Sequence, residues 1–169
     1  MQVTLIAAMS ADGKIAEEKD QVSLDWTSKE DTGFFVKKTK EIGVVIMGRN
    51  TYETIGRPLK DRLNVIMTRD LDGRESEPGV LEWTSDSPVE IIESLAKRGY
   101  DKVALCGGAS VYSAFLQQGL VDDLYLTVEP VLFGKGIPLA SGFDRIDLDL
   151  IDSVLLGEQS VLIHYRVKK

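Results

Sequence analysis

Short apolar stretches rich in β-branched residues recur along the 169-residue chain, and each predicts a strand. Helical patterns lie between several of these stretches. Strands that alternate with helices are typical of βαβ units, in which the strands pair in parallel and the helices cover the sheet. The predicted strands are Val3 to Met9, Val44 to Met47, Leu63 to Met67, Lys102 to Cys106 and Leu124 to Val128.

Three helices carry start and stop signals in the sequence. Ser87 is a predicted N-cap, since Pro88 occupies the first helical position and Glu90 stands three residues after the cap. Gly99 ends this helix. The other two helices are predicted to begin at Ser28 and at about Ser110, and the second of them ends at Gly119.

After Leu148 the pattern changes to two β-like stretches, 148–156 and 161–167, separated by Gly157 and Glu158. This arrangement predicts an antiparallel hairpin added to the sheet. The chain has no fixed-period repeat, low-complexity tract or long linker. We therefore expect a single α/β domain that spans residues 1–169.

Composition and charge exclude several classes of protein. The chain has 20 Lys and Arg against 27 Asp and Glu, a formal net charge of −7, which makes it a poor non-specific partner for nucleic acid or an anionic membrane. Its apolar runs, such as Ile42 to Met47, are far shorter than the roughly 18 residues that span a bilayer. The apolar N-terminus lacks a cationic lead-in, so we expect a cytoplasmic protein.

The chain contains one Cys and one His, which restricts its chemistry. Cys106 cannot close an intrachain disulfide, and with His164 alone beside it no metal site is predicted. Cys-His or Ser-triad catalysis would have to use His164 as its base, which disfavours a hydrolase. We expect His164 to be an ordinary sheet histidine and Cys106 to be a small apolar side chain.

Two glycine turns follow apolar strands and lead into helical patterns, one at Gly48 and one at Gly107-Gly108. Free N–H groups at such turns suit phosphate oxygens. Neither turn matches the dinucleotide fingerprint or the P-loop. The glycines are also explained if they only relieve strain at a βα turn, although Arg49 and Arg69 favour an anion site.

Asp31 is the candidate for proton handling, because it shares a helix face with Phe34 and Phe35. A carboxylate that faces an apolar wall loses hydration, which raises its pKa. Local sequence favours another interpretation, in which Asp31 completes a capping box with Ser28. Arg62, in a turn fixed by a proline, is a candidate for holding a ligand carboxylate.

Several motifs then resemble the dihydrofolate reductase family. They are Leu5 to Ile15, the spacing from Trp26 to Asp31, Met47 to Leu59, Gly107 to Tyr112 and Leu124 to Thr127, and together they cover about the first 130 residues. The resemblance implies a three-layer α/β/α fold with a mostly parallel central sheet of about eight strands and an antiparallel C-terminal strand. It also implies NADPH as the cofactor.

The resemblance implies a pterin site. Asp31 is implied as the carboxylate that binds the pyrimidine edge and helps protonation at N5 while hydride arrives at C6, and Thr127 as its water-linked partner. Arg62 is implied as the holder of the glutamate α-carboxylate of folate. The other implied substrate contacts are Ile6, Ala8, Phe35 and Ile55.

The resemblance implies a cofactor site as well. Gly48, Arg49 and Thr51 resemble the NADPH phosphate turn, and Gly107-Gly108 resembles a glycine pair that this family joins by a cis peptide at the pyrophosphate. Thr68 and Arg69 are implied near the adenosine 2′-phosphate, and the remaining implied cofactor residues are Ala8, Ile15, Cys106, Ala109, Ser110, Val111 and Tyr112.

Two segments depart from this family. Leu120 to Leu124 and Glu129 to Leu139 are more similar to the riboflavin-pathway pyrimidine reductases, which share the fold and NADPH but reduce a ribosylamino-pyrimidine phosphate at its sugar carbon. The chain lacks their Asp-Pro-containing substrate segment, and Arg62 and Asp31 favour folate. The loop from Ala16 does not follow the family pattern, so its closure is not predicted.

Three functional hypotheses follow. The leading one is NADPH-dependent reduction of 7,8-dihydrofolate, and the second is reduction of the pyrimidine phosphate. The third is a nucleotide-binding module without catalysis, which Asp31, Arg62 and Thr127 disfavour because a pure binder needs no substrate set. We expect a small-molecule pterin as the partner, no nucleic acid or membrane, and a monomer or homodimer.

Overall fold

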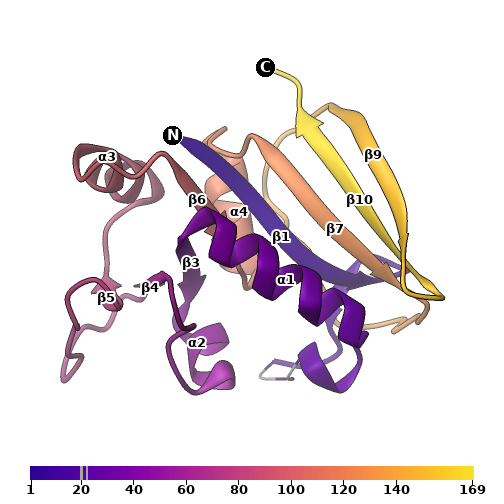
Figure 1. Ribbon diagram of the computed structural model, residues 1–169, viewed down its shortest axis with the longest axis horizontal. Coiled ribbons are helices and arrows are strands. Elements are labelled where there is room, and N and C mark those ends of the chain that lie inside the picture. The colour runs from indigo at the N-terminus through magenta and orange to yellow at the C-terminus, as the bar shows by residue number, and fades with distance from the viewer. Residues whose placement is uncertain (20, 22) are drawn as a thin grey trace.

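A computed structural model of the protein describes residues 1–19, 21 and 23–169 (Figure 1). Within these residues it contains ten strands and four α-helices. The strands are β1 (Gln2–Ser10), β2 (Lys14–Ala16), β3 (Val44–Gly48), β4 (Leu63–Met67), β5 (Leu81–Thr84), β6 (Lys102–Leu105), β7 (Asp123–Glu129), β8 (Ile137–Pro138), β9 (Leu148–Leu156) and β10 (Ser160–Val167). The helices are α1 (Lys29–Ile42), α2 (Arg49–Ile55), α3 (Pro88–Lys97) and α4 (Ala109–Gln117).

Eight of the described strands form one sheet in the order β5-β4-β3-β6-β1-β7-β10-β9. The six strands from β5 to β7 pair in parallel. β10 is antiparallel to β7, and β9 is antiparallel to β10. The predicted mostly parallel sheet with an antiparallel C-terminal hairpin is therefore confirmed. β2 and β8 form a separate small sheet.

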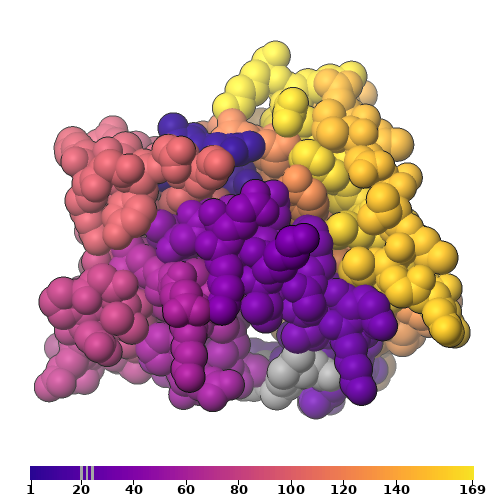
Figure 2. Space-filling view, in the orientation of Figure 1, coloured from indigo at the N-terminus to yellow at the C-terminus, as the bar shows by residue number. Residues whose placement is uncertain are grey.

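Helices cover both faces of the sheet, which explains why its central strands are apolar throughout. In β3, Val44 and Ile46 belong to one apolar cluster and Val45 and Met47 to the other, and all four are fully buried. α3 and α4 pack on the first face, and α1 and α2 on the second, so the three predicted layers are present. Figure 2 shows α1 lying across the second face beside the β9–β10 hairpin.

The predicted helix signals correspond to real caps. Ser87 and Glu90 form a complete capping box at the start of α3. α4 begins at Ala109, one residue before the predicted start, and ends at Gln117. Sequence reasoning did not predict β2, β5 or β8. β2 and β8 have three residues or fewer and are too short to show a period. β5 has four residues, as the predicted β6 has, but it lacks the continuous apolar run that marks β6.

The turn after β1 is tied to the segment after β7 by Asp12. Its carboxylate accepts hydrogen bonds from Ser10 Oγ at 2.6 Å, Phe133 N at 3.1 Å and Gly134 N at 2.8 Å. The bond from Ser10 and those from the two backbone amides lower the pKa of Asp12 to about 2. Downstream of this turn, the loop that starts at Ala16 includes positions 20 and 22, which lie outside the described residues.

No helix in the described part of the chain is long and apolar enough to cross a membrane.

Candidate active site

The carboxyl ends of five parallel strands meet at one edge of the sheet. β1, β3, β4, β6 and β7 run in the same direction (Figure 1). The turns after β3, β4 and β6 therefore lie along the same edge as the ends of β1 and β7. Ligands of α/β sheets commonly bind outside the carboxyl ends of the strands, so this edge is the candidate site.

The two predicted glycine turns touch each other at this edge. Gly48 N donates to Gly107 O at 2.8 Å, which joins the turn after β3 to the turn after β6. Thr51 Oγ1 would lie 3.4 Å from a Cβ at Gly108, so its hydroxyl also faces the second turn. The Gly107-Gly108 peptide is cis, as the family resemblance implied. The structure thus brings together Gly48, Thr51 and the glycine pair.

The helices that leave these turns begin without side-chain caps. Gly48 is the N-cap of α2 and Gly108 that of α4, and neither offers a side-chain acceptor to the first N–H groups. Free N–H groups and the positive end of a helix dipole both favour a phosphate. Arg49 adds a cation beside them, because its ion pair with Glu53, the one it forms among the described residues, is long at 3.9 Å and half-exposed. This donor set fits a pyridine dinucleotide.

The other cofactor candidates lie around these turns. Thr68 follows β4, where its Oγ1 accepts from Asp70 N at 3.2 Å, and the Arg69 side chain is exposed. Ile15 lies on β2, which precedes both glycine turns in the sequence. Cys106, Ala109, Ser110 and Val111 surround the glycine pair, with Cys106 and Val111 buried and Ser110 exposed.

Asp31 lies in the first turn of α1 and is half-buried. Burial raises the pKa of its carboxyl, and the negative charge of Glu129 on β7 raises it further. The Thr127 hydroxyl partly offsets this rise by favouring the charged form. Thr127 itself is 1% exposed and pairs with Ala8 across β1 and β7. The predicted carboxyl, its threonine and Ala8 therefore converge.

The capping-box interpretation of Asp31 is half right. Ser28 is the N-cap of α1, and its Oγ accepts the N–H of Asp31 at 3.2 Å. The backbone N–H of Ser28, however, donates to Glu129 Oε1 at 2.8 Å. A capping box would direct that N–H to the Asp31 side chain. The acceptor comes instead from β7, and the Asp31 carboxyl interacts with Thr127.

Tyr112 connects the two halves of the site. Its side chain, 3% exposed, donates from the hydroxyl to Ile6 O on β1 at 2.7 Å. The hydroxyl would lie 3.4 Å from a Cβ at Gly107. Burial raises the pKa of Tyr112 well above its usual value, and the nearby carboxyl of Asp31 adds to the rise. Tyr112 therefore stays neutral and links β1 to α4 between the glycine turns and Asp31.

Arg62 points inward and is only 8% exposed. Its Nε donates to Lys60 O at 2.8 Å and its Nη1 to Thr39 Oγ1 on α1 at 2.6 Å. These bonds fix the guanidinium beside α1, and neither of them involves Nη2. Burial lowers the pKa of Arg62, but a guanidinium stays charged at neutral pH. Arg62 thus offers a fixed cation beside the helix that carries Asp31.

The remaining predicted substrate contacts differ in their burial. Ile6 is buried on β1, and Phe35 packs half-buried on α1 against the same apolar cluster. Ile55, at the end of α2, is 37% exposed and is the least enclosed of the set. Trp26 precedes α1 and packs edge-on against Phe133, with ring centroids 5.0 Å apart.

Trp26 Nε1 is buried and has no hydrogen-bond partner among the described residues. A buried donor of this kind calls for an acceptor, because leaving it unpaired costs free energy. This indicates that a polar ligand atom or an ordered water belongs beside Trp26.

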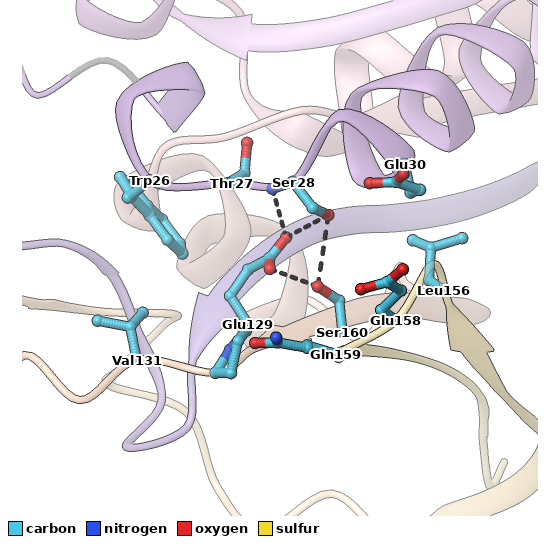
Figure 3. A pocket seen from close by; sticks show the side chains of 11 residues that line it. Trp26, Thr27, Ser28, Glu30, Glu129, Val131, Leu156, Glu158, Gln159 and Ser160 are labelled. Atoms are coloured by element: carbon cyan, nitrogen blue, oxygen red, sulfur yellow. Dashed lines mark hydrogen bonds between the residues drawn. The ribbon is translucent and has the colours of Figure 1, made fainter.

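Sequence reasoning missed the polar cluster at the start of α1. A cavity of about 410 Å³ lies between α1, the end of β7 and the β9–β10 turn (Figure 3). At its base the buried Glu129 carboxylate accepts from Ser28 and from Ser160. The sequence offered one signal for this cluster, since Glu129 stands at the end of an apolar strand. A glutamate is rarely buried unless its charge is paired, so a buried Glu129 requires hydrogen-bond partners.

Three features together are typical of the dihydrofolate reductase-like reductases. They are a mixed sheet with helices on both faces, two glycine turns that touch each other, and the half-buried Asp31 at the edge where the parallel strands end. The sequence model of the dihydrofolate reductase family matches residues 2–131, and the chain belongs to this family.

Individual proteins agree with this assignment. A dihydrofolate reductase of Haemophilus influenzae is 32% identical over 127 residues, which cover 75% of this chain and 71% of that protein. A dihydrofolate reductase from Enterococcus faecalis, complexed with NADP(H), has a TM-score of 0.78 at 22% identity and covers 99% of this chain and 97% of its own.

A second branch of the fold is equally similar in shape. A diaminohydroxyphosphoribosylaminopyrimidine deaminase/5-amino-6-(5-phosphoribosylamino)uracil reductase from Thermotoga maritima has a TM-score of 0.82 at 20% identity. The match covers 99% of this chain and 56% of that one. At such identities the two structural likenesses establish the shared fold.

Proposed function

We propose that the protein reduces 7,8-dihydrofolate to tetrahydrofolate with NADPH. One observation carries the proposal: α1 presents a half-buried carboxyl, Asp31, beside Thr127, and the same helix holds the buried guanidinium of Arg62. A pterin edge needs a carboxyl that can hold and pass a proton, and the glutamate tail of folate needs a fixed cation. Asp31 lies on α1, and Arg62, which precedes β4, is hydrogen-bonded to the same helix.

The proposed cofactor site is formed by the two glycine turns. The N–H groups after Gly48 and Gly108, with Arg49 and Thr51, would hold the pyrophosphate, and Thr68 and Arg69 would face the 2′-phosphate. NADPH, when bound, supplies the hydride. The residues of the chain bind and orient both molecules, so that hydride transfer takes place within one assembled complex.

Asp31 manages the proton in this proposal. Its raised pKa keeps a larger fraction of the carboxyl protonated near neutral pH than an exposed aspartate would have. It would bind the pyrimidine edge and assist protonation at N5, while Thr127 fixes its orientation. The neutral Tyr112, bonded to Ile6 O, keeps the wall between the two halves in place.

The second candidate is reduction of a ribosylamino-pyrimidine phosphate. The likeness in shape to the Thermotoga maritima deaminase/reductase supports it, as does the similarity of Glu129 to Leu139 to the riboflavin-pathway reductases. Asp31 favours the pterin, because a carboxyl that handles a proton suits protonation at N5, whereas the guanidinium of Arg62 can bind either a carboxylate or a phosphate.

A turnover assay tests the proposal. The protein is given NADPH with dihydrofolate or with the ribosylamino-pyrimidine phosphate, and the loss of NADPH absorbance is followed. We expect oxidation with dihydrofolate. Reduction of the pyrimidine phosphate alone would replace the proposal with the second candidate. Tight NADPH binding without oxidation of either substrate would favour a nucleotide-binding module.

A further inference from the structure

Two helices of this chain begin with the same pattern, a serine N-cap followed three residues later by a carboxylate. At α3 the pattern forms a closed local unit. Ser87 N and Ser87 Oγ donate to Glu90 Oε2 at 2.8 and 2.7 Å, and Glu90 N donates back to Ser87 Oγ at 3.4 Å. This geometry is a complete capping box.

At α1 the backbone N–H and the hydroxyl of the N-cap serine donate to a carboxylate from another element. Ser28 N and Ser28 Oγ both donate to Glu129 Oε1 at 2.8 Å, and Asp31 N donates to Ser28 Oγ at 3.2 Å (Figure 3). Glu129, at the end of β7, therefore occupies the place that Glu90 occupies at α3. Asp31 retains only its backbone part in the cap.

Glu129 is held firmly in this position. It is 2% exposed, and its second oxygen, Oε2, accepts from Ser160 Oγ on β10 at 2.5 Å. Three donors satisfy the carboxylate, and the positive end of the 14-residue α1 lies beside it. A buried charge is tolerated when it is bonded in this way. The donors come from two different elements, so the carboxylate cannot turn away easily.

We propose that Glu129 is a positioning residue for the reaction proposed above, because it caps Ser28 in place of Asp31 and so leaves the Asp31 carboxyl facing Thr127. The inference rests on the proposed function for its catalytic consequence. Its structural part, the choice of acceptor for Ser28, stands independently of the substrate.

The alternative arrangement is within reach of the chain. If Glu129 withdrew, Asp31 could accept the Ser28 N–H as Glu90 accepts that of Ser87, and its carboxyl would leave Thr127. The titratable groups recorded as acting on Asp31, or acted on by it, are Glu129 on β7 and Tyr112 on α4. A carboxylate that accepts a backbone N–H is stabilised in its charged form, so its pKa falls.

Two substitutions of Glu129 separate the effect of side-chain length from the effect of charge. Glu129→Asp keeps the charge but shortens the side chain by one methylene, so it no longer spans Ser28 and Ser160. Glu129→Gln keeps the length, and its amide oxygen still accepts from Ser28. Glu90→Asp shortens the equivalent acceptor at α3, away from the site, and is the matched control.

We expect E129D to lose roughly tenfold or more in kcat for dihydrofolate, because a small misplacement of a reacting group has a large effect. E129Q should recover most of that loss, and E90D should keep the wild-type kcat. NADPH affinity should stay unchanged in all three. Equal kcat values in E129D and wild type, or an equal loss in E129Q and E129D, would overturn the proposal.

A second readout does not depend on turnover. The ¹³C-carboxyl resonance of Asp31, assigned with Asp31→Asn, should titrate at a lower pH in E129D than in wild type, although both carry the same charge. An unchanged titration contradicts the positioning role even if no substrate is found. If wild type reduces neither substrate while E129D still shifts the titration, the proposed function fails and the positioning role stands.

Should E129D not fold, Ser160→Ala carries the test. This variant removes one donor to Glu129 and retains its charge and length. We expect the Asp31 titration to move in the same direction, by less than in E129D, with a smaller loss of kcat. An unchanged titration and kcat in S160A would then overturn the proposal.

Discussion

At the scale of the residue, two carboxylates at the start of α1 have different environments and therefore different uses. Glu129 has its hydrogen-bonding capacity filled by Ser28 and Ser160. Asp31 is half-buried beside the Thr127 hydroxyl, and its pKa is raised. A half-buried carboxyl whose pKa is raised in this way is typical of acid–base chemistry.

Asp31→Asn tests the proton-handling role. Asparagine keeps the shape of the side chain but cannot release or accept the proton, so we expect kcat for dihydrofolate at pH 7 to fall by about 10² or more. NADPH affinity, measured by fluorescence titration, should remain that of wild type. Undiminished turnover would show that Asp31 has no part in the reaction.

The same substitution should stabilise the fold. The raised pKa means that the charged carboxyl is less favourable in the folded chain than in the unfolded chain at neutral pH. Removing the charge removes this cost, so the melting temperature of D31N at pH 7 should exceed that of wild type. Scanning calorimetry measures it. A lower melting temperature would mean that the charged form makes favourable contacts in the folded state.

Arg62→Lys tests the substrate cation. Lysine keeps the positive charge but lacks the planar fork that binds a carboxylate through two hydrogen bonds. We expect KM for dihydrofolate to rise roughly tenfold with little change in kcat. Steady-state kinetics with a pteridine substrate that has no glutamate tail is the control, since its KM should not respond. Equal effects on both substrates would assign Arg62 a purely structural role.

At the scale of the element, the glycine turn after β6 depends on a backbone conformation that residues with a side chain rarely adopt. Gly107 has φ 103°, and a Cβ there would lie 3.4 Å from Tyr112 Oη and 3.7 Å from Thr51 Oγ1. The turn therefore combines a special conformation with contacts to both halves of the site.

Gly107→Ala should destabilise the fold by about 1–3 kcal/mol and weaken NADPH binding, because the residue would be held in a sparsely populated conformation. Urea unfolding and NADPH titration measure the two effects. Gly119→Ala is the matched control, since Gly119 also has positive φ, at 62°, but nothing lies within 4 Å of its Cβ position. We expect it to lower stability without changing NADPH affinity, and equal losses of affinity would contradict this account.

At the scale of the whole molecule, Asp12 joins the turn after β1 to the segment after β7, 121 residues away. Its pKa is about 2 in the folded chain, lowered from 3.8 by the bonds from Ser10 and the backbone amides of Phe133 and Gly134. The folded pKa lies below the unfolded one. Its stabilising effect is therefore present above pH 3.8 and is lost as the pH falls toward 2.

Asp12→Asn should accordingly lower the free energy of unfolding at pH 7, and the difference from wild type should shrink as the pH falls toward 2. Urea titrations at pH 7, 4 and 2.5 measure this dependence. A difference that stays constant with pH would show that the charge of Asp12 contributes nothing to stability.

The sequence alone determined the features that arise within a few residues of chain. Apolar runs predicted the central strands, and the signals at Ser28, Ser87, Gly99 and Gly119 located helix ends, because a cap is made within one turn. The glycine turns were recognisable for the same reason. The short strands β2, β5 and β8 were not predicted, since they offer neither a continuous apolar run nor enough residues to show a period.

Only the tertiary structure decided which groups meet. Ser28 has a suitable partner three residues away, yet its N–H bonds to Glu129, which is 101 residues distant. Tyr112 reaches Ile6 across 106 residues, and Arg62 turns toward Thr39. The spacing of residues along the chain shows which groups within one helical turn can form a hydrogen bond. Whether a donor binds a local or a distant acceptor depends on where the packed sheet places β7. This choice of acceptor leaves Asp31 beside Thr127.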